Sequence, residues 1–212
     1  MDATTKKLMD RAGRRTYAED AGVAVKDQPA ALWKLLVLTN LLSARISADI
    51  AVAAARELFA AGGGTSAGML TLTWQQRVDA LGRGHYRRYD EGTATRLGRM
   101  AEIVRDEYGG DLRRLPAKAD RDPDRAAELL EGFPGIGPTG AAIFCREAQA
   151  VWPWLRPYVD PLALKGADRL GLPHDPNRLA KEVPAKDIAR LTAGLVRVAR
   201  NKRLADSITR ET

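Results

Sequence analysis

Apolar residues recur along the chain at three- and four-residue steps, and no sustained stretch alternates between apolar and polar positions. The segment ALWKLLVLTNLLSA, after Pro29, is almost continuously apolar, which predicts a central helix that is buried on all sides. A second helix should follow directly, with Ser47 as its N-cap, Asp49 in its first turn and the glycines at 62–64 as its end. The pattern therefore predicts an all-α fold.

Capping and turn residues divide the rest of the chain. Thr73 and Gln76 form a capping-box pattern for a short helix that should end at Gly82. The next segment, GRGHYRRYDEG, holds arginines, tyrosines and glycines, and it is predicted to be a basic, aromatic loop. Later helices are expected from residue 94 to the glycine pair at 109–110, from Asp122-Pro123 onward, and from Pro184 onward.

The charge balance favours a polyanionic partner. The chain has 212 residues, and 34 Lys and Arg against 27 Asp and Glu give a formal charge of +7. The single cysteine, Cys145, excludes a disulfide framework, a four-cysteine zinc site and a cysteine-held iron–sulfur cluster. The charged first twenty residues are unlike a secretory signal, and the apolar run at 30–42 is shorter than the about 20 residues that span a bilayer. We expect a cytoplasmic monomer without membrane contact.

Two prolines and two glycines, in the order F-P-G-I-G-P, separate two helical segments at residues 133–138. Pro134 should stop the first helix, and Pro138 should open the second, whose first N–H groups are left without partners. Gly135 and Gly137 permit unusual backbone conformations and let an anion approach the backbone. A tight helix–helix turn with no ligand is the alternative interpretation. The basic balance of the chain favours the anion-binding one.

These segments resemble the helix-hairpin-helix DNA glycosylases, most closely the endonuclease III branch. The similarity runs from about residue 29 to residue 204 and is carried by LLSARISADI, DEYGGDL, FPGIGPTGAAIF and YVDPLALKGADRLGL. It implies a two-lobed, all-α fold with a helix-hairpin-helix motif and a cleft between the lobes. The lobes would be residues 30–150, and 1–29 together with 151–212.

The resemblance also implies function: base-excision repair of double-stranded DNA by a glycosylase that flips a damaged or mispaired base and hydrolyses its N-glycosidic bond. The catalytic aspartate falls on Asp160. The N–H groups of Gly135, Gly137 and Thr139 would hold one DNA phosphate, aided by a Na or K ion on the carbonyls of Phe133 and Ile136.

Three departures from the family pattern change this expectation, and one of them is that the loop GHYRRYDEG is longer than the family's corresponding loop. Thr139 stands where backbone-cleaving members have a lysine, and a threonine cannot form the Schiff base of AP lyase chemistry. The C-terminal four-cysteine cluster loop is absent, so no iron–sulfur cluster is expected. The sequence predicts a monofunctional DNA N-glycosylase. The alternative is a helix-hairpin-helix DNA-binding protein with lost or narrowed activity.

The candidate site residues each have a second interpretation. Asp160 precedes Pro161 and would cap a helix, a position that also holds a carboxylate ionised and oriented for catalysis. Arg45 falls where the family inserts a residue into the gap left by a flipped base, or it bonds a helix end. His85 contacts a phosphate or a flipped base, or it is a solvated loop residue. Further basic residues should attract the DNA backbone: Arg87, Arg88, Arg200, Lys202 and Arg203.

Overall fold

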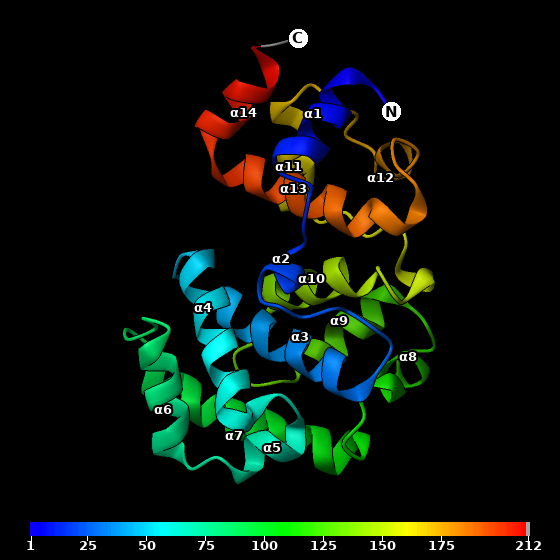
Figure 1. Ribbon diagram of the computed structural model, residues 1–212. Helices are drawn as coiled ribbons and strands as arrows, with labels where there is room; N and C mark the ends of the chain where they lie inside the picture. Colours follow the sequence, from blue (N-terminus) through cyan, green and yellow to red (C-terminus); the bar gives the residue numbers. More distant parts are fainter. Residues whose placement is uncertain (211–212) are drawn as a thin grey trace. The chain divides into compact units, whose positions relative to one another are not determined.

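The computed structural model describes residues 1–210, and within them every regular element is a helix (Figure 1). The chain divides into two compact units. The middle unit is Ala18–Cys145, and the terminal unit joins Met1–Tyr17 to the chain from Arg146 onward. The sequence-based lobes were divided at residues 30 and 150; the division between Cys145 and Arg146 lies inside helix α10 (Pro138–Ala148). The all-α prediction is confirmed.

The middle unit is built around α3 (Pro29–Leu42). Ten consecutive or near-consecutive side chains of this helix are buried, from Leu32 to Leu42, as its unbroken apolar run predicts. Helix α4 (Ala48–Leu58) packs on α3, and α6 (Trp74–Arg83) packs on both α4 and α7 (Asp90–Tyr108). The unit is completed by α2 (Tyr17–Asp20, shared with the terminal unit), α5 (Ser66–Thr71), α8 (Leu115–Lys118), α9 (Pro123–Glu131) and most of α10.

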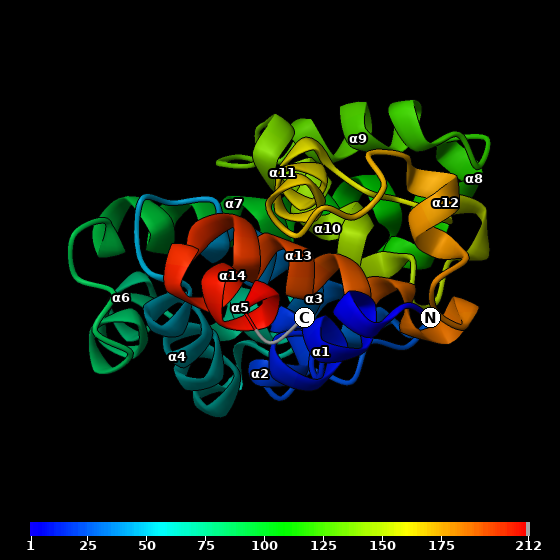
Figure 2. The same ribbon diagram turned by 90° about the horizontal axis from the view of Figure 1, so that it is seen from above.

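The terminal unit is organised by α13 (Ile188–Arg200), whose apolar stripe is buried. Helices α11 (Pro161–Arg169) and α1 (Ala3–Arg11) pack against it, and Figure 2 shows α11 and α13 close together from above. The approach is tight because a Cβ on Gly166 would lie 2.0 Å from the carbonyl oxygen of Leu195. The unit also contains α12 (Pro176–Ala180) and α14 (Lys202–Thr209).

The local signals at helix starts are confirmed. Ser47 accepts a hydrogen bond from the N–H of Ile50, and Thr73 and Gln76 form the full capping box. Asp122 likewise caps α9 through the N–H groups of its first turn. No helix within residues 1–210 has the length and apolarity needed to cross a membrane.

Three sequence-based boundaries are wrong. Helix α6 continues through Gly82 to Arg83, and α7 already begins at Asp90, so the basic loop shrinks to residues 84–89. Pro184 opens a 3-10 turn over Ala185–Asp187, and the α-helix begins only at Ile188. Gly82 lies inside α6 and so does not stop it, whereas Pro184 has a ψ of 147° and is the N-cap of the 3-10 turn.

Candidate nucleic-acid interface and candidate active site

The hairpin, residues 133–138, lies in the middle unit between α9 and α10. Two of its residues, Phe133 and Ile136, are buried, whereas Gly135, Gly137 and Pro138 are exposed. The N–H of Ile136 donates to the carbonyl of Phe133 at 3.0 Å and closes the turn. The two apolar side chains therefore anchor the loop, and the glycine backbone faces outward.

Two side chains from other helices hold the first half of the hairpin. Asn40 of α3 donates from Nδ2 to the carbonyl of Pro134 at 2.9 Å. Gly135 has a φ of +80°, and a Cβ there would lie 2.7 Å from Asn40 Nδ2 and 2.7 Å from Arg96 Cδ. Glycine is required at this position by both its backbone angle and its neighbours.

Gly137 differs from the sequence-based expectation. Its φ lies outside the left-handed region, and a Cβ built on it would meet no atom within 4 Å. A side chain at Gly137 would therefore be compatible with the fold. What glycine provides here is open access to the backbone.

The basic loop at residues 84–89 belongs to the same unit. His85, Arg87 and Arg88 are exposed, and His85 has a φ of 63°. Tyr86 points inward and is fully buried, so the loop is less aromatic at its surface than the sequence suggests. Burial raises the pKa of Tyr86, while the nearby Thr93 and Arg96 oppose that rise. Arg96 thus lies close to both Tyr86 of this loop and Gly135 of the hairpin.

The turn that carries Arg45 also approaches the hairpin helix. A Cβ on Gly140, in the first turn of α10, would lie 2.7 Å from the hydroxyl of Ser43. Arg45 follows two residues later and is exposed. The middle unit therefore brings together three of the predicted DNA-contacting elements: the hairpin, the basic loop and the Arg45 turn.

The remaining basic candidates belong to the terminal unit. Arg200, Lys202 and Arg203 are exposed where α13 ends and α14 begins. Their neighbour Arg197 is different, because it donates to the carbonyls of Ala12 and Arg15 at 2.7 and 2.6 Å. Arg197 therefore has a structural role, in contrast to the three exposed residues.

Asp160, also in the terminal unit, caps α11 as its sequence position predicts. Its Oδ1 accepts from the N–H groups of Leu162 and Ala163 at 2.9 and 3.1 Å. Its Oδ2 forms an ion pair with Arg146 near the end of α10, and both side chains are less than 5% exposed, at 3% for Arg146 and 4% for Asp160. The carboxylate is thereby fixed in one orientation.

Sequence reasoning missed Arg146. The only available signal was a charged pair, Arg146-Glu147, inside the otherwise apolar segment AAIFCREAQA, where a buried charge needs a partner. Gln149 reinforces the same region, since it donates to the carbonyl of Tyr158 at 2.9 Å and accepts from the N–H of Tyr158 at 3.0 Å. The N–H and the carbonyl of Tyr158, two residues before Asp160, are therefore both hydrogen-bonded to Gln149.

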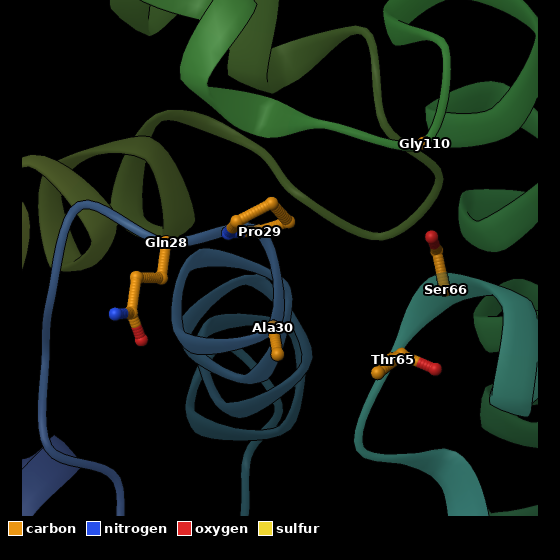
Figure 3. A pocket seen from close by; sticks show the side chains of 6 residues that line it. All are labelled: Gln28, Pro29, Ala30, Thr65, Ser66 and Gly110. Carbon is orange, nitrogen blue, oxygen red and sulfur yellow. The ribbon is translucent and has the colours of Figure 1, made fainter.

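We also searched the described residues for metal-ligand clusters and for hollows near the predicted site residues. Within residues 1–210, no group of three or more His, Cys, Asp and Glu side chains is placed to hold a metal ion. A hollow of about 620 Å³ beside the basic loop includes Arg83 and Arg87 in its wall. A second hollow, of about 340 Å³, lies at the start of α3 (Figure 3) and is lined by Gln28, Pro29, Ala30, Thr65, Ser66 and Gly110. None of the predicted site residues lines this second hollow.

No family model and no curated protein matches the chain. Among solved structures, a non-covalent endonuclease III–DNA complex is 18% identical, covers 91% of this chain and 79% of that chain, and has a TM-score of 0.53. A trapped endonuclease III–DNA covalent intermediate, an estranged-adenine complex, is 19% identical, covers 86% of this chain and 82% of that chain, and has a TM-score of 0.48. With its all-helical architecture and its hairpin between α9 and α10, the chain has a fold similar to that of endonuclease III in the non-covalent complex.

Proposed function

We propose that this protein is a DNA repair glycosylase that flips a damaged or mispaired base from double-stranded DNA and hydrolyses its N-glycosidic bond. The hairpin is the observation that carries the proposal. Its outer face consists of glycine backbone at the N-terminus of the eleven-residue helix α10, and its geometry is fixed by Asn40. An exposed, pre-organised set of N–H groups at a helix N-terminus is suited to bind a phosphate.

The phosphate would bind to the N–H groups of Gly135, Gly137 and Thr139. Within residues 1–210, none of these three N–H groups donates a hydrogen bond to another group. The open space above Gly137 admits a phosphate oxygen without a steric cost. The carbonyls of Phe133 and Ile136 would complete the site with a Na or K ion.

Asp160 would supply the chemistry. Cleavage of the base–sugar bond develops positive charge on the sugar, and a fixed carboxylate stabilises that charge and orients the attacking water. Leu162, Ala163 and Arg146 hold this carboxylate in place. Because Thr139 replaces the lysine of backbone-cleaving relatives, the product would be an intact strand with an abasic site.

The test is a panel of duplexes, each with one damaged or mispaired base. Wild-type protein should convert at least one of them into an abasic product whose strand breaks only after alkali is added. Asp160→Asn should lower this rate by at least about 10²-fold, and the exposed Asp106→Asn should leave it unchanged. Efficient strand scission through a borohydride-trapped adduct would contradict the monofunctional mechanism.

One observation favours a second candidate, a helix-hairpin-helix DNA-binding protein without glycosylase activity. Both oxygens of Asp160 already have partners, and the side chain is buried. A purely structural Asp160 would have the same contacts. If the protein binds every duplex in the panel and releases no base from any of them, this second function is correct and the enzymatic one is wrong.

A further inference from the structure

Arg96 of α7 lies between the hairpin and the basic loop of the middle unit. On the hairpin side, its Cδ and Nε would be 2.7 and 2.8 Å from a Cβ on Gly135. On the loop side, its charge acts on the buried Tyr86 hydroxyl. Its Nη2 donates to Thr93 Oγ1 at 2.7 Å, and its Nη1 would lie 3.5 Å from a Cβ on Gly92. The guanidinium is therefore held near the start of α7, beside two elements expected to contact DNA.

The positive charge of Arg96 has no carboxylate partner in the described chain. Other arginines of α7 do have one: Arg99 pairs with Glu102 at 3.1 Å, and Arg105 pairs with Asp106 at 2.6 Å. Arg96 is half-buried, its Nε is buried without a hydrogen-bond partner in residues 1–210, and a hydroxyl is its one acceptor there. A partly desolvated, unpaired cation is costly, so an anion that binds beside it gains more than it would at a surface arginine.

Arg77 shows that this arrangement is not general for half-buried arginines of the unit. Its Nε also lacks a partner, but Nη1 and Nη2 donate to the carbonyls of Ala94 and Leu72 at 2.9 and 3.1 Å. The carbonyl of Ala94 within α7 and that of Leu72 at the end of α5 thus accept from that guanidinium. Arg96 has two unused donors in residues 1–210: the buried Nε lies beside the hairpin glycine Gly135, and Nη1 lies beside the exposed Gly92.

We propose that Arg96 binds a second DNA phosphate, next to the one held by the hairpin N–H groups. This inference rests on the proposed DNA-binding function and adds a residue to it. The guanidinium offers planar donors that match phosphate oxygens. Because Arg96 lies beside Gly135 and its charge also acts on Tyr86, the second phosphate would bind between the hairpin and the basic loop with His85, Arg87 and Arg88.

The experiment measures affinity for an undamaged duplex at several salt concentrations. Removing one phosphate contact lowers the slope of log K against log salt by about 0.9. Arg96→Met keeps the aliphatic stem and should show this loss of slope together with roughly tenfold weaker binding at moderate salt. Arg96→Lys should keep the slope while it loses part of the affinity. Arg105→Met, on the same helix with a charge already paired, should change neither quantity.

The outcomes separate this inference from the proposed function. A folded Arg96→Met with the wild-type salt slope overturns the Arg96 inference. The positive control is Gly137→Asp, which places a carboxylate where the hairpin phosphate would bind and should strongly weaken binding in the same assay. No duplex binding by the wild-type protein overturns both. If Arg96→Met does not fold, the binding measurement is replaced by NMR of the Arg96 Nε–H in the wild-type protein. This signal is assigned by its absence in Arg96→Lys. A signal that does not shift when duplex is added to wild-type protein also overturns the inference.

Discussion

The hairpin of the middle unit and the Asp160 site of the terminal unit satisfy their polar groups in opposite ways. At the hairpin, the N–H groups of Gly135, Gly137 and Thr139 are without partners in the described chain, and the adjacent Arg96 has no carboxylate. At Asp160, both carboxylate oxygens are occupied and the side chain is buried. The first site is prepared to gain an anion. The carboxylate of the second is already paired within the chain, and only Nε of its partner Arg146 lacks an acceptor in residues 1–210.

This difference separates the two parts of the proposed function. Recognition of DNA uses donors whose partner comes from outside, so it should be sensitive to salt and to added negative charge. Catalysis would use a group whose position is fixed from inside, so it should be sensitive to changes in the supporting side chains. Binding and chemistry should therefore respond to different mutations.

The largest expected effect is on the buried ion pair. Arg146→Met and Asp160→Asn should each lower the free energy of unfolding by about 3–5 kcal/mol, because each leaves an unpaired buried group. The double variant should recover part of this loss, since both partners are then neutral. Urea unfolding of the four proteins gives the coupling energy. Strictly additive losses would show that the pair is not coupled.

The second prediction compares the amide side chain that supports each site. Gln149 makes two hydrogen bonds with the backbone of Tyr158 and also donates to the carbonyl of Arg146 at 3.0 Å and to Thr192 Oγ1 at 3.4 Å, whereas the side chain of Asn40 makes a single bond within residues 1–210, to Pro134. Gln149→Leu should cost about 2–4 kcal/mol and Asn40→Leu about 1–2 kcal/mol.

The two variants should also differ in function, because each should mainly affect the activity of the site that it supports. Gln149→Leu should reduce base release more than duplex affinity, and Asn40→Leu should do the reverse. Thermal unfolding, a duplex titration and the glycosylase assay on each variant make the measurement. An equal effect of both variants on base release and on affinity would contradict the separation.

The third prediction concerns the two glycines of the hairpin. Gly135→Ala should cost about 1–3 kcal/mol, because alanine is strained at a φ of +80° and its Cβ would lie 2.7 Å from Asn40 Nδ2. Gly137→Ala should stay within about 0.5 kcal/mol of wild type, since its Cβ enters open space. Equal destabilisation by the two substitutions would show that Gly137 also has a structural requirement.

Features that depend on contacts between residues close in sequence could be predicted, and features that depend on distant residues could not. Ser47, Thr73 and Asp160 act on N–H groups two or three residues away, so their capping roles were visible in the sequence. The partners Arg146 and Asn40 were not, because they meet Asp160 and Pro134 only after helices have packed.

The hairpin glycines show the same limit. The motif predicts a turn with exposed backbone, but it does not say which glycine needs a positive φ. That depends on Asn40 and Arg96, which come from helices remote in sequence. The boundaries at Gly82 and Pro184 were wrong because a single glycine or proline did not mark the helix end: α6 continues to Arg83, and a 3-10 turn precedes the helix after Pro184.

The smallest expected effect is a loss of stability in alkali, which each unit should show through one buried tyrosine. Burial raises the pKa of Tyr108 in the middle unit, and the charge of Glu107 adds to that rise. Burial also raises the pKa of Tyr17 in the terminal unit, but Arg197, 4.5 Å from its ring, opposes it. Above pH about 10 the unfolded chain loses these protons while the folded chain keeps them, so stability falls as pH rises.

Each tyrosine contributes at most about 1.4 kcal/mol per pH unit. Tyr108→Phe and Tyr17→Phe should therefore both flatten the decline of stability with pH above about 10, as measured by urea unfolding at a series of pH values. Each flattening measures how far folding raises the pKa of that tyrosine against the effect of a nearby cation, which is Lys118 at 4.7 Å from the Tyr108 ring and Arg197 at 4.5 Å from the Tyr17 ring. An unchanged pH dependence in either variant would mean that folding does not raise the pKa of that tyrosine.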